Sequence, residues 1–128
     1  MILYHFCAER HVRKILRQGI AIGGVMEPTD SGFLVHSGWM WLTLDPDPKQ
    51  QSWATNYTIP YSRTAWRLTV EIPKDSEDRI FDREKIVQLY PKADCLFKRW
   101  AGSENWRVYH GIIPKEWIVA ADRQEPYA

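Results

Sequence analysis

The sequence predicts one compact α+β domain with a mixed or antiparallel sheet and a few short helices. Its 128 residues match the usual length of a single domain, and its 45% of apolar residues can fill one core. One amphipathic helix follows the first strand, whereas the later strands come in runs, and this order favours an α+β domain over a doubly wound parallel sheet. We expect the domain to cover residues 1–121 and residues 122–128 to form a C-terminal tail.

The first elements are a strand and a helix. Residues 2–6 are mostly apolar or aromatic, which predicts a short strand. Within residues 8–18, apolar side chains recur at helical spacing and basic ones lie opposite, which predicts an amphipathic helix. Gly19 can end this helix in left-handed geometry, and Ile20 then returns to the core. The apolar positions are Val12, Ile15 and Leu16, and the basic positions, which are solvated or contact phosphate, are Arg10, Arg13, Lys14 and Arg17.

The middle of the chain predicts a long loop and a second strand. Residues 21–38 are rich in Gly with little periodicity, so we expect a loop with at most a short strand over residues 33–36. Residues 39–44 predict a strand that the following Asp-Pro pairs end. Asp47 as N-cap and Pro48 at the first helical position predict a short helix over residues 49–54.

The second half predicts three strands and two helices. Residues 64–72 alternate between apolar and polar side chains, which predicts a half-buried strand. Asp82 can cap a helix that ends near residue 89, with Ile86, Leu89 and Tyr90 as its apolar face. A further helical segment is expected over residues 93–100, and the last two strands over residues 106–113 and 117–121.

Composition narrows the classes of function. The net charge of +1 gives no general excess of cations for nucleic-acid binding, although a local basic patch stays open. Seven Trp suit either a thick core or a cleft that stacks planar rings. Cys7 and Cys95 have no metal-type spacing, and we expect both to be small buried hydrophobes in a reducing, cytoplasmic compartment. No P-loop, GxGxxG, HExxH or GxSxG pattern occurs, and no apolar run has the length of a membrane span.

Three short pieces resemble one family in chain order. The first piece is a strand with Tyr4-His5-Phe6 and the helix after it, which ends with Ile15-Leu16-Arg17-Gln18-Gly19-Ile20. The second is Trp41-Leu42-Thr43, and the third is Gly111-Ile112-Ile113-Pro114. Together they are similar to ADP-ribosyltransferase-like proteins, which include DNA-modifying toxins and RNA 2′-phosphotransferases. The resemblance implies that His5 holds the nicotinamide ribose of NAD, that Thr43 lines the nicotinamide pocket, and that Tyr4 also binds the cofactor.

The resemblance also implies a catalytic carboxylate on a late strand, ahead of the Gly-Ile-x-Pro turn. There it would stabilise the positive charge that develops on the ribose in the transition state. Trp106 stands at that position, and Glu104 lies two residues earlier. Because an offset of two keeps the same face of a strand, Glu104 is the candidate catalytic acid. The alternative is that the carboxylate is lost and the domain only binds a nucleotide.

Rings and guanidinium groups gather between residues 51 and 67. Trp53 and Tyr57 are candidates for stacking on a nicotinamide or a base, and Arg63 and Arg67 for pairing with phosphate. The competing interpretation is a small Trp- and Tyr-rich core with solvated Arg side chains. The sequence does not separate the two.

The leading hypothesis is an NAD-dependent ADP-ribosyltransferase-like enzyme that transfers ADP-ribose to a protein or nucleic-acid acceptor. One alternative is an RNA 2′-phosphotransferase-like enzyme, with Arg63 and Arg67 binding the phosphate. The other is a non-catalytic module that binds a nucleotide or blocks a partner, as a small phage or defence-system protein would do. The acceptor and the oligomeric state stay open.

Overall fold

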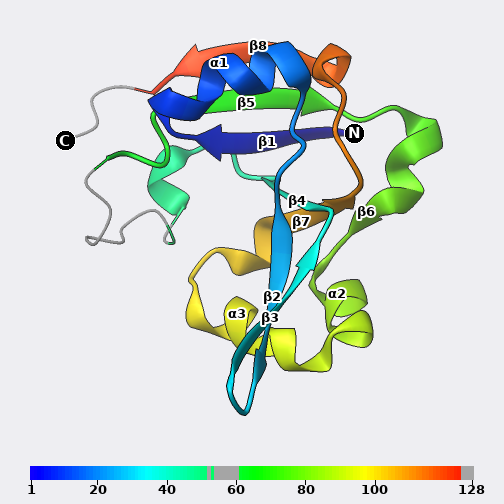
Figure 1. Ribbon diagram of the computed structural model, residues 1–128. Helices are drawn as coiled ribbons and strands as arrows, with labels where there is room; N and C mark the ends of the chain where they lie inside the picture. The colour runs from blue at the N-terminus through cyan, green and yellow to red at the C-terminus, as the bar shows by residue number, and fades with distance from the viewer. Residues whose placement is uncertain (52, 54–60, 125–128) are drawn as a thin grey trace.

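The computed structural model describes residues 1–51, 53 and 61–124, which form an α+β domain (Figure 1). Its main sheet has the strand order β6-β7-β4-β1-β5-β8, and each neighbouring pair in the described chain is antiparallel. The strands are β1 (Ile2–Cys7), β4 (Trp39–Thr43), β5 (Trp66–Glu71), β6 (Ile80–Phe81), β7 (Trp106–His110) and β8 (Ile118–Arg123). The predicted α+β class with an antiparallel sheet is confirmed.

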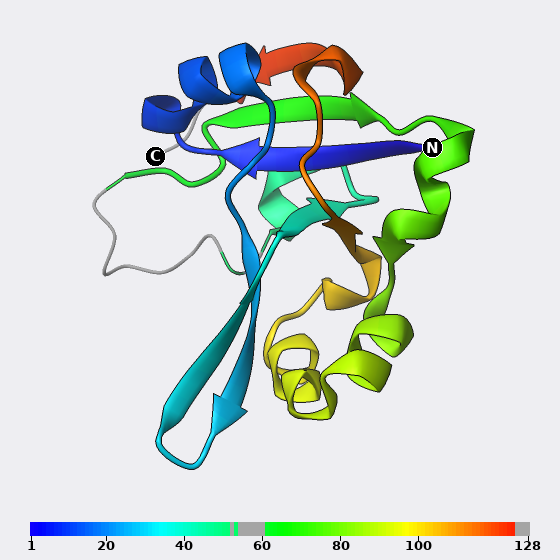
Figure 2. The same cartoon turned by 45° about the vertical axis from the view of Figure 1, so that its right-hand side comes forward.

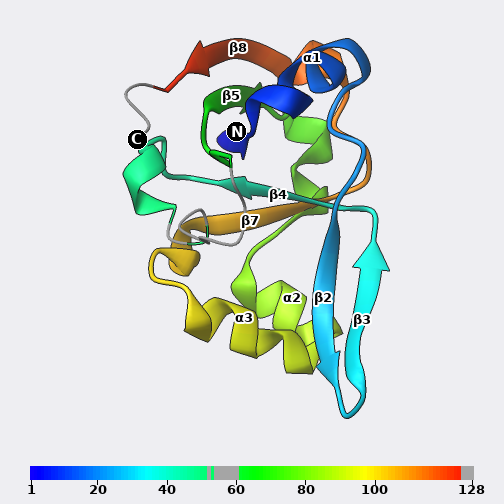
Figure 3. The ribbon, with the colours of Figure 1, turned by 60° about the vertical axis from the view of Figure 1, so that its left-hand side comes forward.

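The main sheet divides into two halves that join at one point. β1 pairs with β5 along its whole length, and β4 pairs with β7 along its whole length. Between the halves, β1 and β4 pair only where Tyr4 faces Thr43. Figure 1 shows β1, β5 and β8 as one group, with β4 and β7 running below it, and Figure 3 shows the same separation from another side. We call this sparsely paired boundary the seam.

One face of the sheet is covered by α1 (Glu9–Gln18). Val12 is buried against Leu68 of β5, and Ile15 packs at the edge of the same core. Gly19 ends the helix at a φ of 84° and its N–H donates to the Ile15 carbonyl at 2.7 Å, as predicted. Leu16 was expected on the apolar face but is 42% exposed, because Val12 and Ile15 already fill the contact with the sheet.

The opposite face is covered over β4 and β7 by two short helices, α2 (Arg83–Leu89) and α3 (Asp94–Arg99). The Asp82 carboxylate accepts a hydrogen bond from the Lys85 N–H at 3.0 Å, so the predicted cap is confirmed. Ile86 is fully buried among aromatic rings. Leu89, in contrast, is 51% exposed, which corrects the prediction that it belongs to the buried face.

The predicted long loop over residues 21–38 is wrong, while the short strand expected over residues 33–36 is confirmed as part of a longer strand. The segment contains two antiparallel strands, β2 (Gly24–Thr29) and β3 (Gly32–Ser37), joined by a tight turn at residues 30–31. Figure 2 shows this hairpin projecting from the body of the domain. The sequence hides these strands because apolar and polar residues do not alternate clearly along them. Glycines and Pro28 interrupt the pattern, and the exposed positions are apolar as well.

Short 3-10 helices connect several of these elements. The helix predicted over residues 49–54 is a 3-10 turn at Pro48–Gln50, capped by Asp47 as expected; residues 52 and 54 lie outside the described part of the chain. Its Asp47 Oδ1 accepts from the Lys49 N–H at 2.9 Å. This first turn is labelled η1 (Pro48–Gln50). Further 3-10 helices are η3 (Lys74–Arg79), η4 (Pro91–Ala93), η5 (Ser103–Asn105) and η6 (Lys115–Trp117).

Several boundaries differ from the predictions. β7 ends at His110 because Gly111 turns away with a φ of 125°. β8 continues to Arg123 and pairs with β5, so residues 122 and 123 belong to the sheet rather than to a tail, and residues 125–128 lie outside the described range. Cys7 is buried, but Cys95 is exposed on α3, which corrects half of the cysteine prediction. Within the described residues, no helix has the length and apolar character needed to cross a membrane.

Candidate nucleotide-binding site

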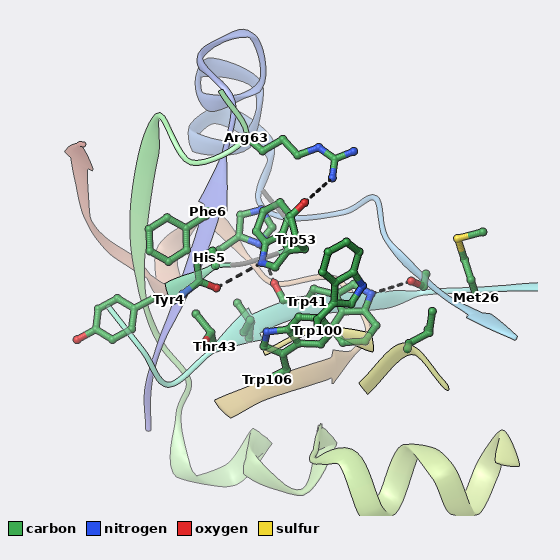
Figure 4. A pocket seen from close by; sticks show the side chains of 14 residues that line it. Tyr4, His5, Phe6, Met26, Trp41, Thr43, Trp53, Arg63, Trp100 and Trp106 are labelled. Carbon is green, nitrogen blue, oxygen red and sulfur yellow. Dashed lines mark hydrogen bonds between the residues drawn. The ribbon is translucent and has the colours of Figure 1, made fainter. Parts of the chain in front are cut away.

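A cavity of about 470 Å³ lies at the seam, on the sheet face that α2 and α3 cover (Figure 4). Seven of its 14 lining residues carry an aromatic ring when the imidazole of His5 is included, and we call it the aromatic cavity. It is lined by Tyr4, His5, Phe6, Gly24, Met26, Trp41, Leu42, Thr43, Gln51, Trp53, Arg63, Leu96, Trp100 and Trp106. None of these described lining residues is acidic.

Four tryptophans give the cavity its character, and each comes from a different part of the chain. Trp41 lies on β4 and Trp106 is the first residue of β7; their rings meet edge to face, with centroids 5.4 Å apart. Trp41 Nε1 donates to the Gly24 carbonyl at 2.8 Å, which fixes the indole against β2. Trp100 follows α3, and Trp53 follows η1. Rings held in this way present rigid faces for a planar ligand.

His5 lies where β1 and β4 separate. Its Nδ1 is 2.8 Å from the Trp41 carbonyl oxygen, so Nδ1–H donates and Nε2 is left as an acceptor in the neutral ring. Burial lowers the pKa of His5, and the hydrogen bond to Trp41 opposes that shift only partly. The imidazole is therefore neutral at physiological pH, and within the described residues its Nε2 has no hydrogen-bond partner. It can accept a hydrogen bond from a ligand hydroxyl.

Thr43 and Tyr4 face each other across the seam. Thr43 is buried, and its Oγ1 accepts from the Asp45 N–H at 3.1 Å. A hydroxyl that accepts one hydrogen bond still has its own proton to donate into the cavity. The Arg67 guanidinium lies over the Tyr4 ring at 5.7 Å from its centroid, on the side of β5.

Arg63 and Gln51 hold Trp53 at the rim of the cavity. Arg63 Nη1 donates to the Trp53 carbonyl at 3.2 Å, and its guanidinium lies 5.8 Å from the centre of the indole. The indole Nε1 donates to Gln51 Oε1 at 3.3 Å, while Gln51 Nε2 donates to the Asp47 carbonyl at 3.1 Å. Arg63 keeps further N–H donors for a ligand.

A second cavity, of about 510 Å³, lies on the α1 side of the sheet, and we call it the basic cavity. It shares His5, Phe6, Trp53 and Arg63 with the aromatic cavity, so the two adjoin at the seam. Lys14 and His11 of α1 also line it, and its described lining residues include no acid. The two cavities thus offer an aromatic site beside a cationic one.

Five predicted site residues meet at the aromatic cavity: Tyr4, His5, Thr43, Trp53 and Arg63. Arg67 lies outside both cavities. Its Nη1 donates to the Pro46 carbonyl at 3.1 Å and its Nη2 lies 3.7 Å from Asp122 Oδ2, so this guanidinium links β5 to the Asp-Pro segment and to β8. Tyr57 falls outside the described residues.

Glu104 also lies outside both cavities. It is exposed in η5, and β7 begins only at Trp106. The expectation that strand alternation keeps Glu104 on the face of residue 106 is wrong, because a 3-10 turn does not alternate side chains between two faces. Trp106, at the position where the resemblance places the carboxylate, lines the aromatic cavity itself.

Sequence reasoning missed several lining residues, among them Phe6, Trp41, Trp100 and Met26. Alternation along β4 could have found Trp41, since it shares a face with Thr43. No local pattern marks Trp100 or Met26, because α3 and an unpredicted hairpin bring them to the site.

Comparisons with protein-family models, with curated proteins and with solved structures find no match to this chain. What the two cavities bind must therefore be inferred from their own side chains.

Proposed function

We propose that the two adjoining cavities bind NAD or a related nucleotide, with a planar ring in the aromatic cavity and phosphate in the basic cavity. The observation that carries this proposal is the shared wall: four indoles line one cavity, the cationic Lys14 and Arg63 line the other, and His5 and Arg63 belong to both. A nucleotide has the same two-part chemistry.

The aromatic cavity suits a base or a nicotinamide. Its volume of about 470 Å³ lies within the range of small-molecule sites, which is roughly 300–1,000 Å³. Stacking of one planar ring on an aromatic side chain contributes about 1–3 kcal/mol. Trp41 and Trp106 already meet edge to face with centroids 5.4 Å apart, so the orientation of both rings is fixed before a ligand binds.

The basic cavity suits an anion. Lys14 has no ion pair within the described residues and supplies a mobile ammonium group, while Arg63 supplies a planar donor set fixed by its bond to Trp53. Without an acid among the described lining residues, a phosphate there meets cations and no opposing carboxylate.

His5 and Thr43 suit the ribose between ring and phosphate. The neutral imidazole accepts from a hydroxyl through Nε2, and the Thr43 hydroxyl donates. Both residues also stand at the positions where the resemblance to ADP-ribosyltransferase-like proteins implies contacts with nicotinamide riboside. This agreement supports NAD over other nucleotides.

ADP-ribosyl transfer is the second candidate, since Glu104 stands two residues ahead of Trp106. Transfer needs a carboxylate beside the ribose, to stabilise the charge that forms as nicotinamide leaves. Because the described lining residues include no acid and Glu104 is exposed, binding without cleavage is the better match. A protein or nucleic-acid acceptor belongs only to this second candidate.

Isothermal titration of NAD and of nicotinamide riboside, which lacks phosphate, tests the proposed binding. We expect Lys14→Ala to weaken NAD about fivefold and to leave nicotinamide riboside unchanged, since one partly solvated ion pair contributes up to about 1 kcal/mol. Arg17→Ala is the matched control, because Arg17 lies on the same helix and does not line the cavity. Absence of NAD binding to the folded wild type would overturn the proposal.

Release of nicotinamide in the same samples separates binding from catalysis. We expect no release above background, for wild type and for Glu104→Gln alike. Release that Glu104→Gln abolishes would instead establish the transferase. Release that depends on added 2′-phosphorylated RNA would favour the phosphotransferase-like chemistry.

A further inference from the structure

The β2–β3 hairpin is anchored at its base and projects from the domain at its tip (Figures 1, 2 and 3). Val25 is fully buried, and the Gly24 carbonyl accepts from the Trp41 indole. The His36 ring stacks on Tyr90 with centroids 3.8 Å apart, and its Nε2 lies 3.1 Å from Glu27 Oε1. These contacts fix the direction in which the hairpin projects.

One face of the hairpin, which we call the outer face, is apolar and exposed towards the tip; nearer the base, its Met26 also lines the aromatic cavity. Met26 faces Val35 across the ladder, and Pro28 faces Phe33, so all four share one face. Met26 is 42%, Val35 58% and Phe33 60% exposed. Leu34, on the other face of β3, is also 52% exposed. A cluster of exposed apolar side chains on a projecting element marks an interaction surface.

The two edges of the hairpin differ. Pro28 leaves β2 without one N–H, which blocks pairing on that side. β3 pairs only with β2 in the described sheet, and Figure 3 shows it on the side of β2 away from α2 and α3. β3 therefore has the open edge.

The register fixes which backbone groups that edge presents. The Gly38 N–H donates to the Gly23 carbonyl at 3.0 Å, so residues 23 and 38 form a hydrogen-bonded pair. Because such pairs alternate along an antiparallel ladder, Leu34 bonds inward to β2, while Phe33 and Val35 direct their N–H and C=O groups outward.

We propose that a second copy of this chain pairs along the open edge, antiparallel to β3, with the two-fold axis at Leu34. Phe33 of each copy then faces Val35 of the other, and both hydrogen-bond through their outward groups. An aromatic residue beside a β-branched one is a favourable cross-strand pair. The two hairpins become one four-stranded sheet with a continuous apolar outer face.

A second copy suits this edge because the strand is self-complementary. Residues 32–37 contain no Asp, Glu, Lys or Arg. When two copies of this strand pair antiparallel, no two side chains of the same formal charge therefore face each other. The edge strand β8, in contrast, carries Asp122 and Arg123, charges of the kind that prevent such pairing. One strand pair buries less than the roughly 1,200 Å² of a standard interface, so the dimer is weak and concentration-dependent. The proposal does not depend on nucleotide binding.

Sedimentation equilibrium over a range of concentrations tests the dimer. We expect the apparent mass of the wild type to rise with concentration towards twice that of one chain. The Val35→Lys variant should stay monomeric, because it places a charged side chain opposite Phe33 of the other copy. Val119→Lys is the matched control: Val119 is 54% exposed on the other edge strand, and this variant should dimerise as the wild type does. A wild type that is monomeric throughout, or a Val35→Lys variant that dimerises normally, would overturn the proposal.

Disulfide trapping tests the register independently, in a Cys95→Ser background. Leu34→Cys should oxidise to a covalent dimer, because the proposed axis brings the two positions to about 4.5 Å between Cα atoms. Phe33→Cys should not form a covalent dimer. In this register position 33 faces position 35 of the other copy, so the two introduced cysteines lie farther apart than the roughly 7 Å between Cα atoms that a disulfide spans. Trapping at Phe33 and not at Leu34 would contradict the register.

Discussion

At the scale of single residues, His5 matters most because its side chain joins the two halves of the sheet. The backbones of β1 and β4 pair only at Tyr4 and Thr43. Next to that pair, the His5 imidazole donates a hydrogen bond to the Trp41 carbonyl. In a regular ladder a backbone N–H would donate this bond. The same ring reaches both cavities. A stabilising contact and a proposed ligand contact therefore depend on one neutral imidazole.

This neutral ring predicts a dependence of stability on pH. Burial holds the pKa of His5 below the ordinary value of about 6.5. Below that pH the unfolded chain binds a proton that the folded chain does not, so the free energy of unfolding falls as the pH falls from 6.5 towards the folded pKa. Urea unfolding at pH 7.5 and 5.5 should show this loss in the wild type and a smaller loss in His5→Gln.

His11→Gln is the matched control for that experiment, because it replaces a histidine on the exposed side of α1, away from the contact between β1 and β4. An equal loss of stability in wild type and His5→Gln would contradict the assignment of a neutral His5 with a lowered pKa.

The two thiols should react at very different rates. Burial and the nearby Glu9 carboxylate raise the pKa of Cys7 to about 11, so its thiolate is scarce at pH 8, whereas Cys95 is exposed. An Ellman titration of the native protein should show one fast thiol, and Cys95→Ser should remove it while Cys7→Ser should not. A fast thiol that persists in Cys95→Ser would show that β1 is open to solvent.

At the scale of elements, Gly19 joins α1 to the sheet. Its φ of 84° ends the helix, and a Cβ there would collide with the Ile113 carbonyl, whose oxygen accepts from the Ile20 N–H at 2.9 Å. The turn between α1 and the main sheet therefore needs both a left-handed backbone and the absence of a side chain.

Gly38 allows these two requirements to be separated. Its φ of 88° is nearly the same, yet a Cβ there meets nothing within 4 Å. Gly38→Ala should cost only the strain of a left-handed residue, about 1–2 kcal/mol, and Gly19→Ala should cost clearly more because the collision adds to it. Denaturant unfolding of both variants measures the difference, and equal losses would show that the backbone at Ile113 moves aside without cost.

Elements with regular alternation or capping could be predicted from the sequence. β5, α1 and the Asp82 cap of α2 have patterns that depend only on near neighbours. The β2–β3 hairpin could not, because its outer face is exposed and apolar and its strands lack the contrast that a buried face provides. Glu104 was misplaced for a related reason, since where β7 begins depends on its pairing with β4 at Thr43 and Trp106.

At the scale of the whole molecule, the fold brings distant tryptophans to one cavity. Trp41 and Thr43 meet Trp106 because β4 pairs with β7, and Trp100 reaches them because α3 packs over that pair. Sequence could name His5, Thr43 and Arg63 as candidates, but the grouping of indoles depends on tertiary packing. The split sheet, with one cavity on each face where the two halves meet at the seam, is the feature that the nucleotide proposal requires.

The most direct test of that proposal follows the tryptophan indole N–H signals of a ¹⁵N-labelled sample by NMR during titration with NAD. The sequence has seven Trp, so seven signals are expected. Those of Trp41, Trp53, Trp100 and Trp106 should shift, because these residues line the aromatic cavity, while those of Trp39, Trp66 and Trp117 should hold their positions. Shifts confined to the second group, or no shift at millimolar NAD, would contradict the account.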